Sequence, residues 1–301
     1  MAASSVSVLD IDAAAFADAF ARRSVAVHHR LSDHPLFSID AIAELADRLP
    51  ADSVRRERGN LPIGKYGKYV DVGEGPPSET IRNVERTGTR VSLRDIQQVP
   101  EYADLINGCL DEVAPLVADR EGGMTDRAGY LFISAPASTT PMHFDREHSF
   151  LLQVEGVKHV SVAAFEDDPA ALQRERDCYA DGGECDFEAM QAVAETFTIT
   201  PGLGVYLPSN VPHWVETEAG ISISFSIPFD TKFVQQAEAV MAMNRRMRRM
   251  HLSPRPAGAS PRADSSRSSR NAICPCPPAI TTSTSIASYR ANRPNFSRSR
   301  R

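Results

Sequence analysis

The sequence predicts a mainly β protein with flanking helices, in which an antiparallel sandwich or barrel forms the core. Two observations carry this prediction. The second half of the chain contains short β-rich runs separated by Gly, Pro and polar turns, whereas the first half has helical periodicity. The chain has 301 residues, of which 42% are hydrophobic, and this is enough to bury a sizeable core and excludes wholesale disorder.

Helical signals dominate residues 1–125, which we expect to form a helical and mixed flank of the barrel. Each expected helix begins near a capping residue and ends at a Gly, a Pro or a loss of periodicity. The expected helices run from Asp10 or Asp12 to about Arg22, from Ser38 or Asp40 to Pro50, from Ser78 to Gly88, and from Pro100 to about Val117. One short strand, 91–96, is expected between the last two.

The barrel is expected over residues 126–230. Its strands are predicted at 129–135, 150–156, 158–165, 196–200, 204–208, 213–217 and 221–229. Residues 166–195 interrupt this pattern and read as a helical insertion over the barrel mouth. A final helix over 231–251 ends in several arginines, which suits the negative end of a helix dipole. This helix packs either on its own barrel or across a homodimer.

The charge is unevenly distributed along the chain. Residues 252–301 hold nine arginines and one acid, Asp264, so this segment carries +8 of a chain with net charge −6 and leaves −14 on residues 1–251. An acidic body argues against a broad nucleic-acid groove. The tail has few large apolar residues, so we expect a disordered basic segment. Its abrupt change of composition also fits a reading frame that slipped near the end of the gene.

Neither a membrane span nor a secretion signal is apparent. No apolar run approaches 18 residues, and the amino terminus lacks the basic start and long apolar stretch of a signal peptide. The five cysteines are odd in number and scattered, which indicates free thiols. We therefore expect a cytoplasmic protein.

The stretch TTPMHFDREHSF carries the most informative residues. His143 and Asp145 are separated by one residue at the mouth of a strand, so both side chains point to the same side. A third ligand is expected from a neighbouring strand, where His213 follows a Pro-bounded turn. Two imidazoles and one carboxylate on one face leave adjacent coordination positions open, which is the ligand set of non-haem Fe(II) oxygenases.

Two further residues suit a dicarboxylate cosubstrate. Thr140 lies three residues before His143, and Lys158 lies fifteen residues after it on the following strand. A dicarboxylate bound to the metal through its 2-oxo acid end needs a cation and a hydroxyl donor at its far carboxylate. Thr140 and Lys158 fit these two roles.

These segments together resemble the JmjC or cupin-like Fe(II)/2-oxoglutarate oxygenases, especially the branch containing the asparaginyl hydroxylase of hypoxia-inducible factor. The resemblance covers about residues 126–230 and implies a double-stranded β-helix, or jelly roll. It implies Fe(II) held by His143, Asp145 and His213, with 2-oxoglutarate held by Thr140 and Lys158 and dioxygen as the oxidant. It also implies hydroxylation of an unactivated C–H bond, with succinate and carbon dioxide as coproducts.

Some positions depart from the family pattern. Ser149 stands where many members have Asn, and Ser226 falls roughly where a second Asn often lies near the cosubstrate. Both hydroxyls retain the ability to hydrogen-bond there. Tyr130 is a further candidate for lining the pocket, although a strand tyrosine of this kind often belongs to the core.

Several functional alternatives stay open at this point. The substrate is an amino-acid side chain in a protein or peptide, a free amino acid or another small molecule, and an acidic body suits a basic partner. A noncatalytic cupin-like regulatory protein is the main rival, although its triad would be expected to be broken. A metal-dependent isomerase would favour more His ligands without Lys158, and histone demethylation ranks below hydroxylation because no chromatin-reading module is visible.

Overall fold

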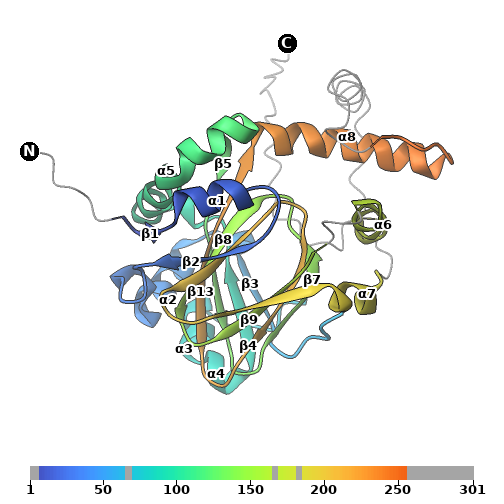
Figure 1. Cartoon of the computed structure of the whole chain (residues 1–301). Coiled ribbons are helices and arrows are strands. Elements are labelled where there is room, and N and C mark those ends of the chain that lie inside the picture. Colours follow the sequence, from blue (N-terminus) through green and yellow to red (C-terminus); the bar gives the residue numbers. More distant parts are fainter. Residues whose placement is uncertain (1–6, 65–69, 165–168, 181–184, 256–301) are drawn as a thin grey trace, which may run out of the picture.

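Two antiparallel sheets face each other in the computed structural model, which describes residues 7–64, 70–164, 169–180 and 185–255 (Figure 1). The larger sheet has the strand order β1-β2-β11-β8-β13-β6-β4-β3, with β5 paired to β13, and the smaller has the order β10-β9-β12-β7. From the sixth strand onward, successive strands alternate between the two sheets except for β9 and β10, and strands distant in sequence pair within each sheet. This is the topology of a double-stranded β-helix. The predicted fold is therefore confirmed.

Seven of the eight barrel strands follow the expected positions closely, and β7, which carries Thr140 and His143, was not among the predicted ranges. The eight are β6 (Tyr130–Ser134), β7 (Thr139–Phe144), β8 (His148–Glu155), β9 (Lys158–Ala163), β10 (Ala194–Ile199), β11 (Leu203–Leu207), β12 (Pro212–Thr217) and β13 (Ser222–Thr231). β12 lies between β7 and β9 in the smaller sheet, so His213 pairs with His143 on one side and Val162 on the other. This pairing brings the predicted ligands from distant segments onto neighbouring strands.

The first half of the chain also adds strands that the sequence did not predict. These are β1 (Leu9–Asp10), β2 (Val25–His29), β3 (Val54–Arg58) and β5 (Met124–Arg127), while β4 (Thr89–Leu93) partly overlaps the strand expected at 91–96. β3 has the sequence VRRER and pairs with β4 at the edge of the larger sheet. Its inward side chains are polar because they line a pocket, and this removes the apolar alternation by which strands are recognised.

Helices cover the outside of the larger sheet. They are α1 (Ala13–Ala19), α2 (Ile39–Arg48), α3 (Pro77–Arg82), α4 (Val84–Thr87) and α5 (Pro100–Glu121). The Asp12 carboxylate caps α1, and α5 ends at Gly122 in the left-handed conformation. The single helix expected from Ser78 is divided at Asn83 into α3 and α4. A large apolar core fills the space between these helices and the sheet.

The remaining helices belong to the insertion and to the end of the described chain. They are α6 (Pro169–Ala180), α7 (Phe187–Ala192) and α8 (Lys232–Arg249). Figure 1 shows α6 and α7 beside the barrel near β7, and α8 beyond one end of the barrel. The expected tail lies outside the described residues from 256 onward. Within the described ranges, no helix is both long and apolar enough to cross a membrane.

Candidate active site

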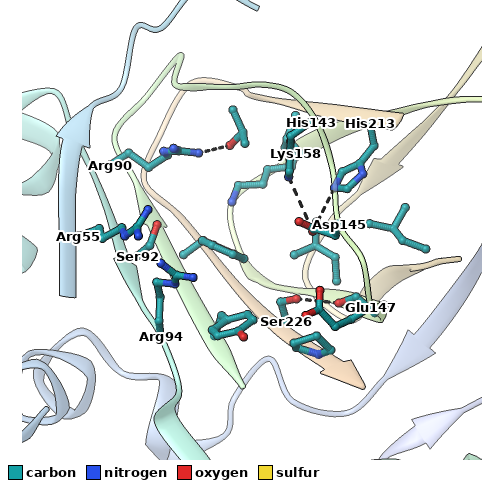
Figure 2. A pocket seen from close by; sticks show the side chains of 18 of the residues that line it. Arg55, Arg90, Ser92, Arg94, His143, Asp145, Glu147, Lys158, His213 and Ser226 are labelled. Carbon is teal, nitrogen blue, oxygen red and sulfur yellow. Dashed lines mark hydrogen bonds and ion pairs between the residues drawn. The ribbon is translucent and has the colours of Figure 1, made fainter. Parts of the chain in front are cut away.

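A polar pocket opens between the two sheets (Figure 2). β3 and β4 of the larger sheet form one wall, and β7, β9 and β12 of the smaller sheet form another. All eight predicted site residues line this pocket, namely Tyr130, Thr140, His143, Asp145, Ser149, Lys158, His213 and Ser226. The interior below them is apolar, because Leu151, Val160 and Leu207 form part of a buried cluster between the sheets.

His143, Asp145 and His213 form the only cluster of His, Cys, Asp or Glu side chains among the described residues that could hold a metal ion. One ligand atom from each residue lies within 4.8 Å of the others. The Asp145 Oδ2 atom is 3.8 Å from His143 Nε2 and 3.6 Å from His213 Nε2, which is longer than a hydrogen bond (Figure 2). Three donor atoms therefore surround one point without bonding to one another.

The backbone fixes the orientation of both imidazole rings. His143 Nδ1 donates a hydrogen bond to the Pro141 carbonyl at 2.8 Å, and His213 Nδ1 donates one to the Val211 carbonyl at 3.0 Å. Each neutral ring consequently keeps a lone pair on Nε2, facing Asp145. Burial and the neighbouring His213 lower the pKa of His143 to about 4, which keeps its ring unprotonated at neutral pH. Imidazoles oriented in this way and one carboxylate fit a divalent transition metal.

Lys158 and Thr140 lie at the β7 and β9 side of the pocket. Lys158 is buried and its Nζ atom donates to Ser224 Oγ at 2.8 Å. Burial, with a contribution from the like charge of Arg90, lowers the pKa of Lys158 to about 7. Arg90 also donates to Thr140 Oγ1 at 2.5 Å, so the threonine hydroxyl proton remains available to an acceptor in the pocket.

Arg90 and its partner Glu57 were missed by the sequence reasoning. They form a buried ion pair between β4 and β3, where their backbones are directly paired. The sequence TRVSLR, at positions 89–94, could have indicated Arg90. Its polar residues recur at every second position, which places Arg90, Ser92 and Arg94 on one face of a strand. The segment was instead interpreted as an ordinary short strand.

Ser149, Ser226 and Tyr130 come from the larger sheet. The hydroxyls of Ser149 on β8 and Ser226 on β13 are 2.8 Å apart and hydrogen-bond to each other. Tyr130 on β6 lies opposite Ser226 in the sheet and is buried. One hydroxyl proton of the serine pair remains for a ligand, because only one of the two hydroxyls donates within the pair.

Three residues on the barrel strands near the site lie away from the pocket lining. His159 points outward, where it contacts Thr198 and Glu218, as expected for the neighbour of an inward-facing Lys158 on a strand. Trp214 packs edge-on against Phe187 on the outer side of the smaller sheet. Tyr206 belongs to the aromatic core beside α1 rather than to the pocket.

Comparisons with known proteins agree with this architecture. Residues 123–237 match the family model described as the JmjC domain. Solved structures of YcfD, a ribosomal oxygenase from Escherichia coli, are similar over 89% of this chain and 68% of theirs. The complex with cobalt and 2-oxoglutarate has 17% identity and a TM-score of 0.50, and another YcfD structure has 16% identity and a TM-score of 0.46. No protein of curated function matches the sequence. The fold is thus that of JmjC, cupin-like proteins.

Proposed function

We propose that this chain is an Fe(II)- and 2-oxoglutarate-dependent oxygenase that hydroxylates a C–H bond of an amino-acid side chain in a protein, peptide or small molecule. The observation that carries the proposal is the arrangement of His143, Asp145 and His213, with both imidazole lone pairs directed at one carboxylate oxygen. The JmjC match, together with the cobalt and 2-oxoglutarate of the YcfD complex, supports a metal ion and 2-oxoglutarate as cofactors.

The three ligands would hold Fe(II), which supplies activation of dioxygen when bound. Lys158 would bind the far carboxylate of 2-oxoglutarate as an ammonium, and Thr140 would donate its hydroxyl proton to the same group. Arg90 positions Thr140 for this role through its hydrogen bond and is itself held by Glu57. A charge-assisted pair of donors at one end orients the cosubstrate toward the metal ligands.

The apolar end of the pocket has a separate task. Leu151, Leu207 and Val215 line it, so water is excluded from the space beside the cosubstrate. The Ser149–Ser226 pair leaves one hydroxyl proton for a carboxylate oxygen nearer the metal. The resemblance to the ribosomal oxygenase YcfD supports a protein substrate.

The test is succinate formation from 2-oxoglutarate by anaerobically purified protein supplied with Fe(II), ascorbate and air. We expect turnover in the wild type and its loss in His143→Ala and Lys158→Ala. Mn(II) binding separates the two variants, since only His143→Ala should lose the metal. Failure of the wild type to bind either Mn(II) or 2-oxoglutarate would contradict the proposal and favour a noncatalytic barrel.

The pH dependence of cosubstrate binding provides a second readout. The Lys158 ammonium has a pKa of about 7 in the unliganded protein, so its charge is present below pH 7 and is lost as the pH rises. A bound carboxylate favours the charged form, so 2-oxoglutarate affinity should fall above pH 7 by up to about tenfold per pH unit. Lys158→Met should bind weakly at every pH.

A further inference from the structure

A second arginine lies on the same face of β4 as Arg90. Arg90, Ser92 and Arg94 alternate along this strand and its continuation, and all three line the pocket. Arg94 is 8% exposed. Figure 2 shows it beside Ser92 and Arg55, across the pocket from the side on which His143, Asp145 and His213 lie.

The two arginines differ in how their charge is balanced. Arg90 forms a buried ion pair with Glu57 and a hydrogen bond to Thr140. For Arg94, the described part of the chain provides neither a hydrogen bond nor an ion pair to the guanidinium, and its Nε atom is buried without a partner. A guanidinium does not lose its proton in proteins, so this cation cannot become neutral to relieve its burial. Burying such a charge is costly unless an anion meets it.

Two hydroxyls accompany Arg94. In the antiparallel register, Ser92 pairs with Phe132, and continuation of that register brings Arg94 opposite Tyr130. The hydroxyls of Ser92 and Tyr130 receive no hydrogen bond from the described residues, although both residues are buried in the pocket wall. One guanidinium and two hydroxyls thus form a group of donors without an acceptor.

The acids in this part of the pocket do not provide that acceptor. Glu147 lines the pocket, but its carboxyl is paired with Arg146, 3.1 Å from Nη2. The Asp145 carboxylate belongs to the metal-binding cluster. A ligand must therefore supply the negative charge that Arg94 lacks.

The far carboxylate of 2-oxoglutarate is poorly placed to do so. Arg90 contacts Thr140, which marks the cosubstrate end, and Arg94 lies four residues farther along the strand. At a rise of about 3.3 Å per residue, this is about 13 Å. A carboxylate held by Thr140 and Lys158 does not span that separation. Arg94 consequently faces a different anionic group.

We propose that Arg94, together with Ser92 and Tyr130, binds a carboxylate of the substrate that is oxidised. This inference rests on the proposed oxygenase function and adds the chemical class of its substrate. The substrate carries a carboxylate, either the α-carboxylate of a free amino acid or the side chain of an acidic residue in a peptide. Bidentate pairing of Arg94 with that group would fix the reacting carbon on the side of the pocket facing the metal ligands.

The test compares acids with their neutral amides. The full chain, loaded with Mn(II) and 2-oxoglutarate without oxygen, is titrated calorimetrically with free L-amino acids and with the corresponding amino-acid carboxamides. A second arm compares the capped tripeptides acetyl-Ala-Asp-Ala-amide and acetyl-Ala-Glu-Ala-amide with their Asn and Gln counterparts. We expect at least one acid to bind tenfold or more tightly than its amide, and the arm in which it appears identifies the source of the carboxylate.

Variants assign the preference to Arg94. Arg94→Gln should reduce the acid preference below twofold, and Arg94→Lys should retain part of it. Arg58→Gln is the matched control because Arg58 is an exposed arginine on β3 that faces away from this pocket. Far-ultraviolet circular dichroism checks that each variant is folded, and Arg94→Met serves if Arg94→Gln is not.

Separate 2-oxoglutarate titrations distinguish the two proposals. Its affinity should change less than threefold in Arg94→Gln and fall strongly in Lys158→Met. An Arg94→Gln variant that loses 2-oxoglutarate as completely as Lys158→Met would overturn the inference, because Arg94 would then belong to the cosubstrate site. Equal binding of acids and amides by the wild type, or an acid preference that survives in Arg94→Gln, would also overturn it. If the wild type binds no 2-oxoglutarate, only the proposed oxygenase function is contradicted. The preference for acids over amides can then still be measured on protein loaded with Mn(II) alone.

Discussion

Two histidine–carboxylate clusters contain histidines only five residues apart in the sequence, His143 and His148, and differ in whether the histidine lone pairs are taken up by protein hydrogen bonds. In the first, His143 and His213 face Asp145 in the pocket. In the second, His148 faces Glu121 in the core behind β8. Both contain imidazole and carboxylate groups that are at least partly buried, yet only the first leaves the ligand atoms of its rings directed at a space that a metal can occupy.

The second cluster is saturated by protein hydrogen bonds. His148 Nε2 donates to Glu121 at 3.0 Å, while its Nδ1 atom accepts from the Ser209 backbone at 3.2 Å and pairs with the Tyr206 hydroxyl at 2.8 Å. The ring also packs against Phe20 and Phe229. Both ring nitrogens of His148 are thus occupied by protein hydrogen bonds and offer no lone pair to a metal. The cluster instead joins the end of α5 to the larger sheet and stabilises that junction. Proximity of a histidine to an acid therefore does not by itself indicate a metal site.

The largest effect is expected from Asp145→Ala. Its carboxylate receives no hydrogen bond from the described side chains, so removal should leave folding stability unchanged or slightly increased. Turnover should fall by about a thousandfold or more, because a metal ligand is lost. Mn(II) titration and succinate formation measure the effect, with the exposed Asp40→Ala on α2 as control. A strongly destabilised Asp145→Ala protein would show that the first cluster is structural as well.

His148→Ala should produce the opposite pattern. It leaves the Glu121 carboxylate buried without its imidazole partner and opens a cavity among aromatic rings, so unfolding free energy should fall by about 3–5 kcal/mol. Mn(II) affinity of the folded fraction should stay within threefold of the wild type. Urea denaturation is the measurement.

The matched control for that variant is His159→Ala. His159 also contacts an acid, Glu218 at 2.8 Å, but both side chains are substantially exposed. An exposed pair of this kind contributes at most about 1 kcal/mol. Equal losses in the two histidine variants would contradict the view that burial of the second cluster determines its contribution.

Glu121→Gln should make stability depend less on pH. Burial raises the pKa of Glu121, but the hydrogen bonds from His148 and from the Thr231 hydroxyl outweigh burial and lower it below its ordinary 4.5. A lowered folded-state pKa adds stability above about pH 4.5 that is lost as pH falls through the folded value. The variant should therefore be about 1–2 kcal/mol less stable at pH 7 and nearly equal to the wild type in acid. If the variant and the wild type differed in unfolding free energy as much at pH 3 as at pH 7, the ionised Glu121 carboxylate would not be the cause.

The comparison also shows which part of the site can be predicted from sequence. His143 and Asp145 are two residues apart on a strand, so local geometry alone places them together. Period-two runs likewise predicted the barrel strands. Glu121 is 27 residues from His148 at the end of a helix, and no local spacing reveals that pair. Arg90 and Arg94 were missed because the strand expected at 91–96 was interpreted only as an ordinary strand, and its partner β3 carries inward charges that hide the apolar pattern of a strand.

Tyr206→Phe should give the smallest effect and tests whether the second cluster is saturated. The Tyr206 hydroxyl accepts from the Ala21 backbone at 3.0 Å and pairs with His148 Nδ1 at 2.8 Å. Its loss should cost about 1 kcal/mol in urea denaturation, because the ring remains in the core and the Ser209 amide still bonds to Nδ1. If Nδ1 were thereby freed to bind metal, Tyr206→Phe would gain a second Mn(II) equivalent. We expect none, because the ring stays fully buried and Glu121 still occupies Nε2.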